Sequence, residues 1–476
     1  MNGPTTLTGS GRGLAPVDCD VPVPTLTIAF GPVPARFGER ACPGGAPFPL
    51  NRTAPVFPGG PLADPEVSRI HAELRREPAG GWVIGDLGSK NGTHVNGARV
   101  GADGLRLASG DVIRVGDTLL LFHETLCPAP SDHAIEGMLG HSDGARVLRA
   151  ATMRCASSTA TVLVLGETGA GKDLVARAVA SIGRPGRPFV AFNAGAVPPA
   201  LVDSTLFGHV RGAFTDAREA RPGLFRAASG GTLFLDEVGD LAPETQVRLL
   251  RAVEERAVVP VGAVQPVPVD VRLVAATNRD LAAEAAAGRF RGDLYARLAG
   301  SVIRVPPLRD RRADVPLLAT AFAAAFAAEA TNEAAAARTF TPKAMTRLML
   351  HPWPFNVREL KAVVGQSIVE GPGRGCLDVP ASVLSRLDEH ARLFAHDGSP
   401  AGSPAGSAEG APSPAPSASG VAPGDHMPGI PDRAAVEAAL ARAGGNMTGA
   451  ADALGKDRGQ FYRIVRRLGI DPDRFR

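Results

Sequence analysis

The sequence lacks a cysteine pattern, a long apolar run and a strong net charge. Its five cysteines are scattered and odd in number, and no pair has metal-ligand or CxxC spacing. This usage argues against a disulfide framework and fits a reducing cytoplasm. The longest charge-free apolar stretch, residues 315–328, is too short to span a bilayer, so we expect a buried, alanine-rich helix there. Because the N-terminus has no basic segment followed by an apolar run, we expect no signal peptide and no membrane association.

Length and charge set further bounds. A chain of 476 residues is too long for one compact core, so two to four domains are expected. A hydrophobic content of 44% with 21% charged residues is ordinary for a soluble globular protein. The net charge of +3 gives no whole-chain signal for nucleic acid, and only local clusters can carry one.

Composition divides the chain into segments. Residues 1–130 are rich in Gly, Pro and Val, with short alternating runs between turn signals, which is typical of a small all-β domain. Residues 135–375 alternate apolar strand-like runs with helical patterns, which indicates a parallel α/β domain with a helical lid from about 307. Residues 397–430 are mostly Ala, Gly, Ser and Pro and predict a flexible linker. The last 45 or so residues regain a helical pattern, so a small all-α domain is expected there. The strand-like runs are 162–165, 232–235 and 273–276.

A glycine-rich loop, residues 166–173, follows the first of these runs and leads into a helical pattern at 174–180. Glycines let backbone amides wrap phosphates, and Lys172 places a positive charge at a helix N-terminus beside the β- and γ-phosphates of a nucleotide. The usual P-loop has Ser or Thr after the lysine, whereas Asp173 stands here. A plain Gly-rich turn is the alternative, but the flanking strand and helix favour a nucleotide site.

The run at 232–235 ends in two carboxylates, Asp236 and Glu237. In an ATPase, Asp236 would hold Mg²⁺ through water, and Glu237 would orient the attacking water as general base. Paired carboxylates after a strand also occur as a helix N-cap. Together with the glycine-rich loop they predict an ATPase with ATP and Mg²⁺ as cofactors.

Between these two motifs lies the segment 212–217, Gly-Ala-Phe-Thr-Asp-Ala. It closely resembles the GAFTGA loop of bacterial enhancer-binding proteins, the AAA+ activators of sigma-54 RNA polymerase, and the resemblance covers about 135–372. In that family the loop touches sigma-54 when ATP is bound. Asp216 replaces the family's glycine, but Asp tolerates positive φ better than most residues, so we expect a working loop with altered efficiency. The segment's residues, all expected at the sigma-54 contact, are Gly212, Ala213, Phe214, Thr215, Asp216 and Ala217.

The same resemblance implies further nucleotide contacts. It places Thr277 and Asn278 near the γ-phosphate, makes Arg358 a lid contact to the nucleotide, and has Asn193 bind the glutamate that ends the acidic strand. The residues that it assigns to ATP binding are Gly166, Glu167, Thr168, Gly169, Ala170, Gly171, Lys172, Asp173, Thr277, Asn278 and Arg358.

It also implies catalysis shared between subunits. Arg291 and Arg297 would reach the ATP of a neighbouring subunit, where a guanidinium stabilises charge on the transferring phosphoryl group. A homo-oligomeric ring, a hexamer, is therefore expected. The catalytic residues are then Asp236, Glu237, Arg291, Arg297 and Asn193.

The C-terminal segment 431–472 has two short helical patterns and a third, basic one from about 458, with a glycine in the turn. It is similar to the Fis-type helix-turn-helix that ends most enhancer-binding proteins. Residues 456–476 carry a net charge of +4, the electrostatic footprint of DNA binding, although a solvated basic helix would share it. The residues expected at enhancer DNA are Arg458, Gln460, Arg463, Arg466 and Arg467.

The N-terminal segment 22–124 contains Ser-Arg-Ile-His at 68–71, Gly-Ser-Lys-Asn-Gly at 88–92 and Asn-Gly at 96–97. This series resembles a forkhead-associated (FHA) domain, an all-β sandwich that binds phosphothreonine through guanidinium and hydroxyl groups. His71 and Asn96 are expected to be structural. An FHA fold without a working phosphate site is the alternative. The residues expected at the phosphopeptide are Arg52, Ser68, Arg69, Lys90 and Asn91.

These patterns predict a three-domain cytoplasmic regulator in a Ser/Thr kinase pathway, with a phosphothreonine sensor, a sigma-54-activating ATPase and a DNA reader. One rival is a phosphopeptide-responsive DNA-binding ATPase that represses or scaffolds, because Asp216 alters the loop. Another rival is an AAA+ remodeller of a different client, such as a chelatase-like or protease-associated ATPase, against which the C-terminal helix-turn-helix argues.

Overall fold

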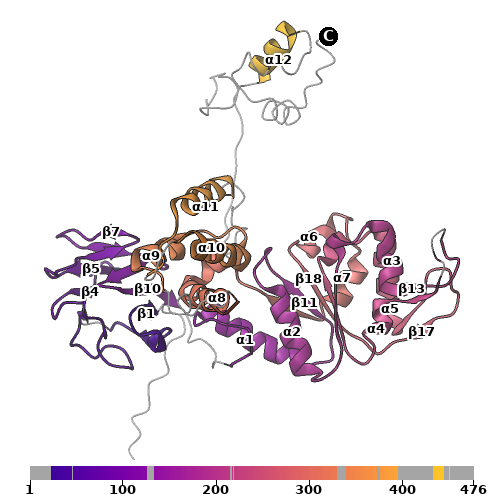
Figure 1. Cartoon of the computed structure of the whole chain (residues 1–476), viewed down its shortest axis with the longest axis horizontal. Coiled ribbons are helices and arrows are strands. Elements are labelled where there is room, and N and C mark those ends of the chain that lie inside the picture. The colour runs from indigo at the N-terminus through magenta and orange to yellow at the C-terminus, as the bar shows by residue number, and fades with distance from the viewer. Residues whose placement is uncertain are drawn as a thin grey trace, which may run out of the picture. The chain divides into compact units, whose positions relative to one another are not determined.

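The computed structural model describes residues 23–44, 47–125, 133–214, 217, 219–329, 339–371, 376–394, 433–443 and 450 (Figure 1). The chain divides into two compact units, Met1–Pro400 and Ala401–Arg476. The first contains an all-β part, a parallel α/β part and a helical lid. Over the described residues, every helix is too short or too polar to cross a membrane.

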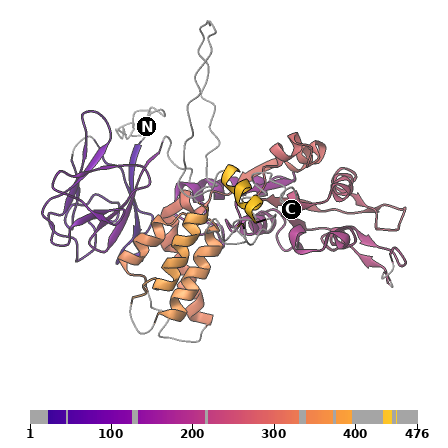
Figure 2. The ribbon, with the colours of Figure 1, turned by 90° about the horizontal axis from the view of Figure 1, so that it is seen from above.

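The all-β part is a sandwich of two antiparallel sheets, drawn in indigo and violet in Figure 2. One sheet has the order β2-β1-β10-β9-β6-β7 and the other the order β3-β4-β5-β8. Strand alternation directs Trp82 and Ile84 of β5 into the core between the sheets. The strands are β1 (Val23–Phe30), β2 (Arg40–Ala41), β3 (Phe48–Leu50), β4 (Ala72–Arg76), β5 (Trp82–Asp86), β6 (Thr93–Val95), β7 (Ala98–Arg99), β8 (Leu105–Leu107), β9 (Val112–Val115) and β10 (Thr118–Thr125).

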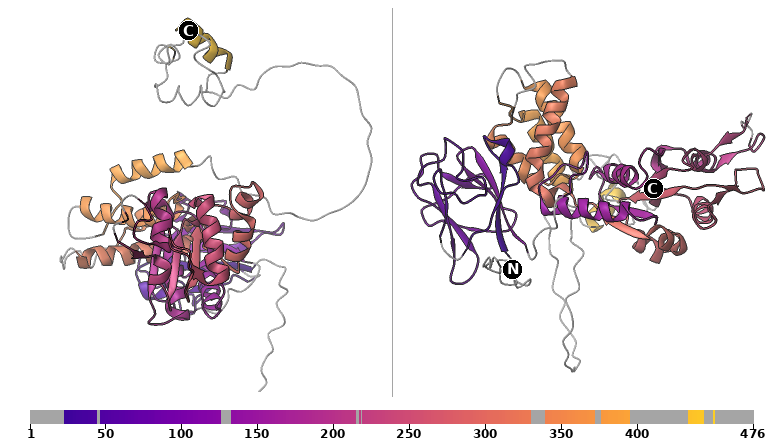
Figure 3. Two further views of the ribbon diagram at one scale, coloured as in Figure 1. Left: turned by 90° about the vertical axis from the view of Figure 1, so that its right-hand side faces the viewer. Right: turned by 90° about the horizontal axis from the view of Figure 1, so that it is seen from below.

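The α/β part has a five-stranded parallel sheet of order β12-β15-β18-β11-β19, with helices on both faces (Figure 3). The three predicted apolar runs are confirmed as strands β11, β15 and β18. In β11, Leu163 packs into an apolar layer with α3, α5 and α7, whereas Val162 and Val164 pack into another with α1 and α2. The sheet strands are β11 (Val162–Leu165), β12 (Phe189–Asn193), β15 (Thr232–Asp236), β18 (Arg272–Thr277) and β19 (Ser301–Arg304).

Short elements surround this sheet. Two antiparallel pairs, β13 with β14 and β16 with β17, lie outside it. Their bounds are β13 (Gly208–His209), β14 (Arg221–Pro222), β16 (Ala257–Val258) and β17 (Val267–Pro268). The helices are α1 (Asp143–Ala156), α2 (Lys172–Gly183), α3 (Pro199–Phe207), α4 (Leu224–Ala227), α5 (Pro243–Glu255), α6 (Leu281–Ala286) and α7 (Gly292–Leu298).

The lid begins with a 3-10 segment, η4 (Leu308–Asp314), and continues with α8 (Val315–Glu329), α9 (Pro342–Leu350), α10 (Asn356–Glu370) and α11 (Ala381–Phe394). Helix α8 confirms the predicted alanine-rich helix, and its buried side chains include Leu318, Ala319 and Ala323. Trp353 is fully buried, and its indole N–H donates to the carbonyl oxygen of Leu348 at 2.9 Å. The lid therefore has a well-packed apolar centre.

In the second unit the described helix is α12 (Arg433–Arg442). Val436, Ala439 and Leu440 are buried, at the helical spacing that the sequence indicated. The remaining residues of the predicted DNA reader, apart from 443 and 450, and the predicted linker 397–430 lie outside the described residues.

Candidate active site

The glycine-rich loop joins the end of β11 to the start of α2. Gly169 and Gly171 have φ of 74° and 102°, in the left-handed region that residues with a Cβ rarely adopt. Lys172 is the first residue of α2, and its side chain is only 7% exposed. Its Nζ donates to the carbonyl oxygen of Gly166 at 3.0 Å and lies 3.5 Å from Oε1 of Glu237. The loop thus holds its lysine against a carboxylate from a different strand.

The acidic pair stands where β15 ends. Glu237 has a left-handed φ of 52°, a conformation that costs a non-glycine residue about 1–3 kcal/mol. Burial and the neighbouring Glu237 carboxylate raise the pKa of Asp236 above its ordinary value. Asn278, just after β18, donates its backbone N–H to Oε2 of Glu237 at 3.3 Å and its Nδ2 to Oγ1 of Thr168 at 3.1 Å. The carboxyl ends of β11, β15 and β18 therefore converge on one site.

Asn193 has a different partner from the one predicted. The sequence resemblance assigned it to Glu237, but its Nδ2 donates to Oδ2 of Asp236 at 3.0 Å. The reason is strand register: β12 pairs with β15 in parallel so that Asn193 stands directly beside Asp236. Its amide therefore orients the first carboxylate of the pair in this structure.

The other predicted loop and strand residues are also placed. Thr277 is fully buried, its carbonyl oxygen accepts the N–H of Gly166 at 3.3 Å, and its Oγ1 accepts the N–H of Arg279 at 3.1 Å. The Thr277 hydroxyl therefore already has a donor from within the chain. Asp173 is exposed in the first turn of α2.

Helix α10 of the lid closes the loop from the other side. The N–H of Val357 donates to the carbonyl oxygen of Gly169 at 3.0 Å. A Cβ on Gly169 would lie 2.3 Å from the carbonyl oxygen of Phe355 and 2.9 Å from Cβ of Arg358, so only glycine fits. Arg358 is exposed, and its Cβ lies beside the loop at Gly169.

Sequence reasoning missed two side chains that hold the loop. Asn356, buried at φ 54°, donates from Nδ2 to Oε2 of Glu167 and to the carbonyl oxygen of Thr168, each at 3.1 Å. Arg309 of η4 binds the same Glu167 with both terminal nitrogens, at 2.8 and 2.5 Å. Asn356 lies two residues before Arg358, which the resemblance singled out, but nothing in the sequence pointed to Arg309, which is 142 residues from its partner.

The two predicted catalytic arginines lie on the surface around α7. Arg291 pairs with Asp293, with 2.6 Å between Nη2 and Oδ2. Arg297 is exposed and lines a hollow with Thr161, which precedes β11, whereas the glycine-rich loop follows β11. Arg297 therefore lies near the amino end of β11, whereas the glycine-rich loop of the same chain lies at its carboxyl end.

Residues 212–214 and 217 of the predicted sigma-54 contact lie in the connection between β13 and β14, which is called the Phe214 turn below. The N–H of Gly212 donates to the carbonyl oxygen of Ala217 at 2.8 Å, and the N–H of Ala217 donates to the carbonyl oxygen of Phe214 at 2.9 Å. Phe214 is 39% exposed, and its ring centre lies 5.0 Å from that of His209. The turn thus presents an apolar ring to its surroundings.

The predicted phosphopeptide residues surround Ser68 in the all-β part. The Ser68 hydroxyl accepts the backbone N–H of Lys90 at 3.2 Å, and Arg52, Arg69 and Lys90 are exposed. His71 is fully buried and its Nδ1 accepts the N–H of Ser68 at 3.0 Å, which confirms the predicted structural role. Burial lowers the pKa of His71. The backbone N–H of Arg52 donates to the carbonyl oxygen of Ser68 at 3.2 Å, so the backbones of Arg52, Arg69 and Lys90 all lie next to Ser68.

Two asparagines fix neighbouring loops. Asn91 donates from Nδ2 to the carbonyl oxygen and to Oε2 of Glu66, at 2.9 and 2.8 Å, so its amide N–H groups are used inside the domain. Asn96 donates to Oδ1 of Asp111 at 2.8 Å and accepts the N–H of Val112 at 2.9 Å. The predicted structural role of Asn96 is thereby confirmed.

Several predicted site residues lie outside the described part of the chain. They are Thr215, Asp216, Arg458, Gln460, Arg463, Arg466 and Arg467.

Comparison with known families matches three segments. Residues 138–304 match the sigma-54 interaction domain, residues 56–116 the FHA domain and residues 309–381 the AAA+ ATPase lid domain. These matches cover the glycine-rich loop, the acidic strand end, the loop bearing Phe214 and the Ser68 site.

Individual proteins match as well. The transcriptional regulatory protein ZraR of Escherichia coli strain K12 is 51% identical over 234 residues, which are 49% of this chain and 52% of that protein. The response regulator protein PilR of Pseudomonas aeruginosa is 50% identical over 234 residues, 49% of this chain and 51% of that protein. A crystal structure of NtrX from Brucella abortus has 29% identity and a TM-score of 0.48, and the match covers 70% of this chain and 69% of that one. The chain thus spans about half the length of ZraR and PilR.

Proposed function

We propose that this chain, which carries a sigma-54 interaction domain and an AAA+ lid behind an N-terminal FHA domain, is a sigma-54-dependent transcriptional regulator driven by ATP hydrolysis. The observation that carries the proposal is the convergence of Lys172, Asp236 and Glu237 at the carboxyl end of one parallel sheet, under the lid helix α10. In open α/β sheets, ligands bind at that edge.

The nucleotide would lie along the loop that ends at Lys172. Backbone N–H groups at the start of α2 favour phosphate oxygens, and Lys172 would exchange part of its contact with Glu237 for the β- and γ-phosphates. Asp236 would hold Mg²⁺ through water. Burial and then the neighbouring Glu237 carboxylate raise its pKa, and a bound cation would favour the charged carboxylate against both effects. Bound Mg²⁺ would neutralise charge on the phosphates.

Hydrolysis would then depend on Glu237. Its carboxylate is directed by a left-handed backbone and held by the N–H of Asn278, which suits a general base that orients a water against the γ-phosphate. Asn278 also contacts Thr168 of the loop, so it is placed to sense the γ-phosphate.

The positions of Arg291 and Arg297 support shared catalysis. Both are on the surface around α7, and Arg297 lies away from its own chain's loop, so each would act on the nucleotide of a neighbouring subunit. This requires a closed ring with head-to-tail contacts, which we propose is a hexamer.

Partners follow from the other segments. Phe214 on its turn would meet sigma-54, and hydrolysis would move that turn. Ser68 with its surrounding cations would bind phosphothreonine supplied by a Ser/Thr kinase, and the basic C-terminal segment would bind enhancer DNA in the cytoplasm.

The test is binding of the full chain to sigma-54 in the presence of ADP and aluminium fluoride, a transition-state mimic, for the wild type and Asp216→Gly. Phe214→Ala is the matched control, and this variant is expected not to bind sigma-54. If wild type and Asp216→Gly both bind, the chain is an activator. If only Asp216→Gly binds, the natural protein is a phosphopeptide-responsive DNA-binding repressor or scaffold; if neither binds while ATP is hydrolysed, its client is another protein.

A further inference from the structure

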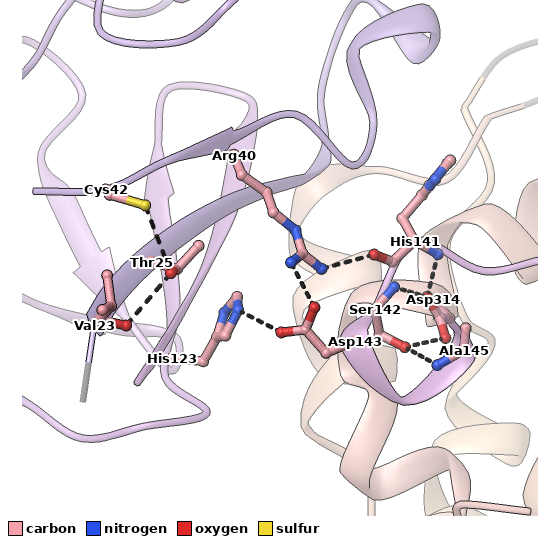
Figure 4. A network of polar contacts seen from close by, with 10 residues as sticks. All are labelled: Val23, Thr25, Arg40, Cys42, His123, His141, Ser142, Asp143, Ala145 and Asp314. Atoms are coloured by element: carbon pink, nitrogen blue, oxygen red, sulfur yellow. Dashed lines mark hydrogen bonds and ion pairs between the residues drawn. The ribbon is translucent and has the colours of Figure 1, made fainter. Parts of the chain in front are cut away.

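One carboxylate joins the FHA domain to the ATPase domain (Figure 4). Asp143 is the first residue of α1. Arg40 of β2 places Nη1 2.5 Å from Oδ1 of Asp143 and donates from Nη2 to the carbonyl oxygen of His141 at 3.0 Å. His123 of β10 places Nε2 3.5 Å from Oδ2 of the same Asp143. The side chains of Arg40, His123 and Asp143 are mostly buried by this contact.

The backbone nearby is shaped for close approach. Gly38, just before β2, has φ 87°, and a Cβ there would lie 2.6 Å from the ring of His141. A glycine is therefore needed both for the turn and for the contact with the segment that leads into α1.

The FHA domain also contacts the lid. Arg312 of η4 donates from Nη1 to the carbonyl oxygen of Gly110, in the turn between β8 and β9, at 3.0 Å. Strands β1, β9 and β10 pack against η4, α8 and α9, and buried apolar residues of sandwich and lid form one continuous cluster. The FHA domain thus touches both the α/β part, through α1, and the lid.

Segment η4 connects these contacts to the nucleotide loop. Arg309 binds Glu167, and Arg311, three residues before Asp314, donates from Nη2 to the carbonyl oxygen of Ala170 at 2.9 Å. Asp314 accepts the backbone N–H groups of His141 and Ser142 at 2.6 and 2.8 Å. A single seven-residue segment therefore touches the loop, the FHA domain and the start of α1.

The phosphopeptide residues lie at the other end of the sandwich. The turn after β9 is near them, because a Cβ on Gly116 would lie 2.9 Å from the backbone of Glu66. The turn before β9 contains Gly110, which binds the lid. A docked FHA domain therefore keeps Ser68 and its cations open.

We propose that the FHA domain is a brace: it fixes the lid against the α/β part and thereby slows nucleotide release. The nucleotide would lie between the loop of the α/β part and Arg358 of the lid, so its exit requires these two parts to separate. A third body bound to both opposes that separation. The inference rests on the proposed nucleotide site, and it does not depend on which client the ATPase serves.

The test follows docking and nucleotide release in the full chain. Docking is read from diethylpyrocarbonate modification of His123, mapped by mass spectrometry, with the exposed His133 as internal reference. Release is read from the dissociation rate of a fluorescent ADP. Arg40→Glu breaks the contact from the FHA side, and Asp143→Asn weakens it from the ATPase side. Arg76→Glu, which reverses an exposed charge on β4, is the matched control.

We expect Arg40→Glu to raise the modification rate of His123, relative to that of His133, at least fivefold. The dissociation rate of ADP should rise by about the same factor. Asp143→Asn should change both readouts in the same direction, and Arg76→Glu should change neither. Exposure of His123 without faster release overturns the brace, as does a wild-type protein in which His123 reacts as fast as His133. If the Arg40→Glu variant releases ADP faster but the wild type does not hydrolyse ATP, the brace is supported and the proposed ATPase function is refuted.

Discussion

Replacing Asp314 by alanine should be the most destabilising single change among the contacts around η4. Asp314 is fully buried and accepts three hydrogen bonds: from the N–H of His141 at 2.6 Å, from the N–H of Ser142 at 2.8 Å and from the Ser142 hydroxyl at 2.6 Å. Its negative charge also stabilises the charged form of Arg311, a residue that is 6% exposed. The variant would leave three buried donor groups without their acceptor and would remove a negative charge that stabilises the buried Arg311.

The magnitude follows from these contacts. A hydrogen bond to a charged acceptor contributes about 1.5–3 kcal/mol, and removal of one partner from a buried charge network costs about 3–5 kcal/mol in total because such terms are not additive. We therefore expect a loss of about 4 kcal/mol, a large share of the roughly 5–15 kcal/mol that stabilises a domain. With a urea m-value of about 3 kcal/mol/M, the midpoint should fall by roughly 1–1.5 M.

The chain offers a local probe for this measurement. It has two tryptophans, Trp82 in the FHA sandwich and Trp353 in the lid, so Trp82→Phe leaves Trp353 to report on the lid alone. Urea unfolding followed by Trp353 fluorescence is then compared for Asp314→Ala and for Asp310→Ala, an exposed carboxylate in the same segment. Asp310→Ala should stay within about 0.5 kcal/mol of the parent. Equal midpoints for the two variants would refute the assigned role of Asp314.

Three further outcomes are expected. Burial would raise the pKa of Asp143, but hydrogen bonds from His123 and Arg40 lower it to about 2. The ionised carboxylate should therefore stabilise the folded protein by about 2 kcal/mol above pH 4, and this contribution should disappear as the pH falls to about 2. It is measured as the difference in unfolding free energy between the wild type and Asp143→Asn. Gly208→Ala should abolish sigma-54 binding while ADP affinity changes less than twofold in fluorescence titrations, because the new Cβ would lie 2.6 Å from the carbonyl oxygen of Arg221 at the base of the turn. Ser68→Ala should lower the affinity for a phosphothreonine peptide at least tenfold, measured by calorimetry with the unphosphorylated peptide as control. Unchanged affinity would exclude the Ser68 hydroxyl from the site.

Much of the active site was predictable because its parts lie in local patterns. An apolar run, a glycine-rich loop and a helical run in direct succession predicted the placement of Lys172 at the start of α2, and the acidic end of β15 followed from the same logic. The carboxyl ends of parallel strands lie at the same edge of a sheet, so these motifs could be expected to converge without coordinates.

The contacts that join the lid and the sandwich to the rest of the molecule were not predictable in this way. Arg309 and Glu167 are 142 residues apart, and Arg40 and Asp143 are 103 apart, so only packing of the lid and the sandwich reveals them. The partner of Asn193 depended on the register between β12 and β15, which side-chain alternation alone does not define. Charged residues of these kinds are common on surfaces, and the sequence gives no sign of which ones meet.

The left-handed backbone at Glu237 has a consequence for how the protein can evolve. Glycine adopts φ near 52° without strain, so Glu237→Gly would relieve local strain while it removes the proposed general base. Selection for folding alone would therefore drive this position away from glutamate, and only selection for turnover keeps it. If the proposed ATPase function holds, a variant of this chain without that activity can for this reason have the larger unfolding free energy.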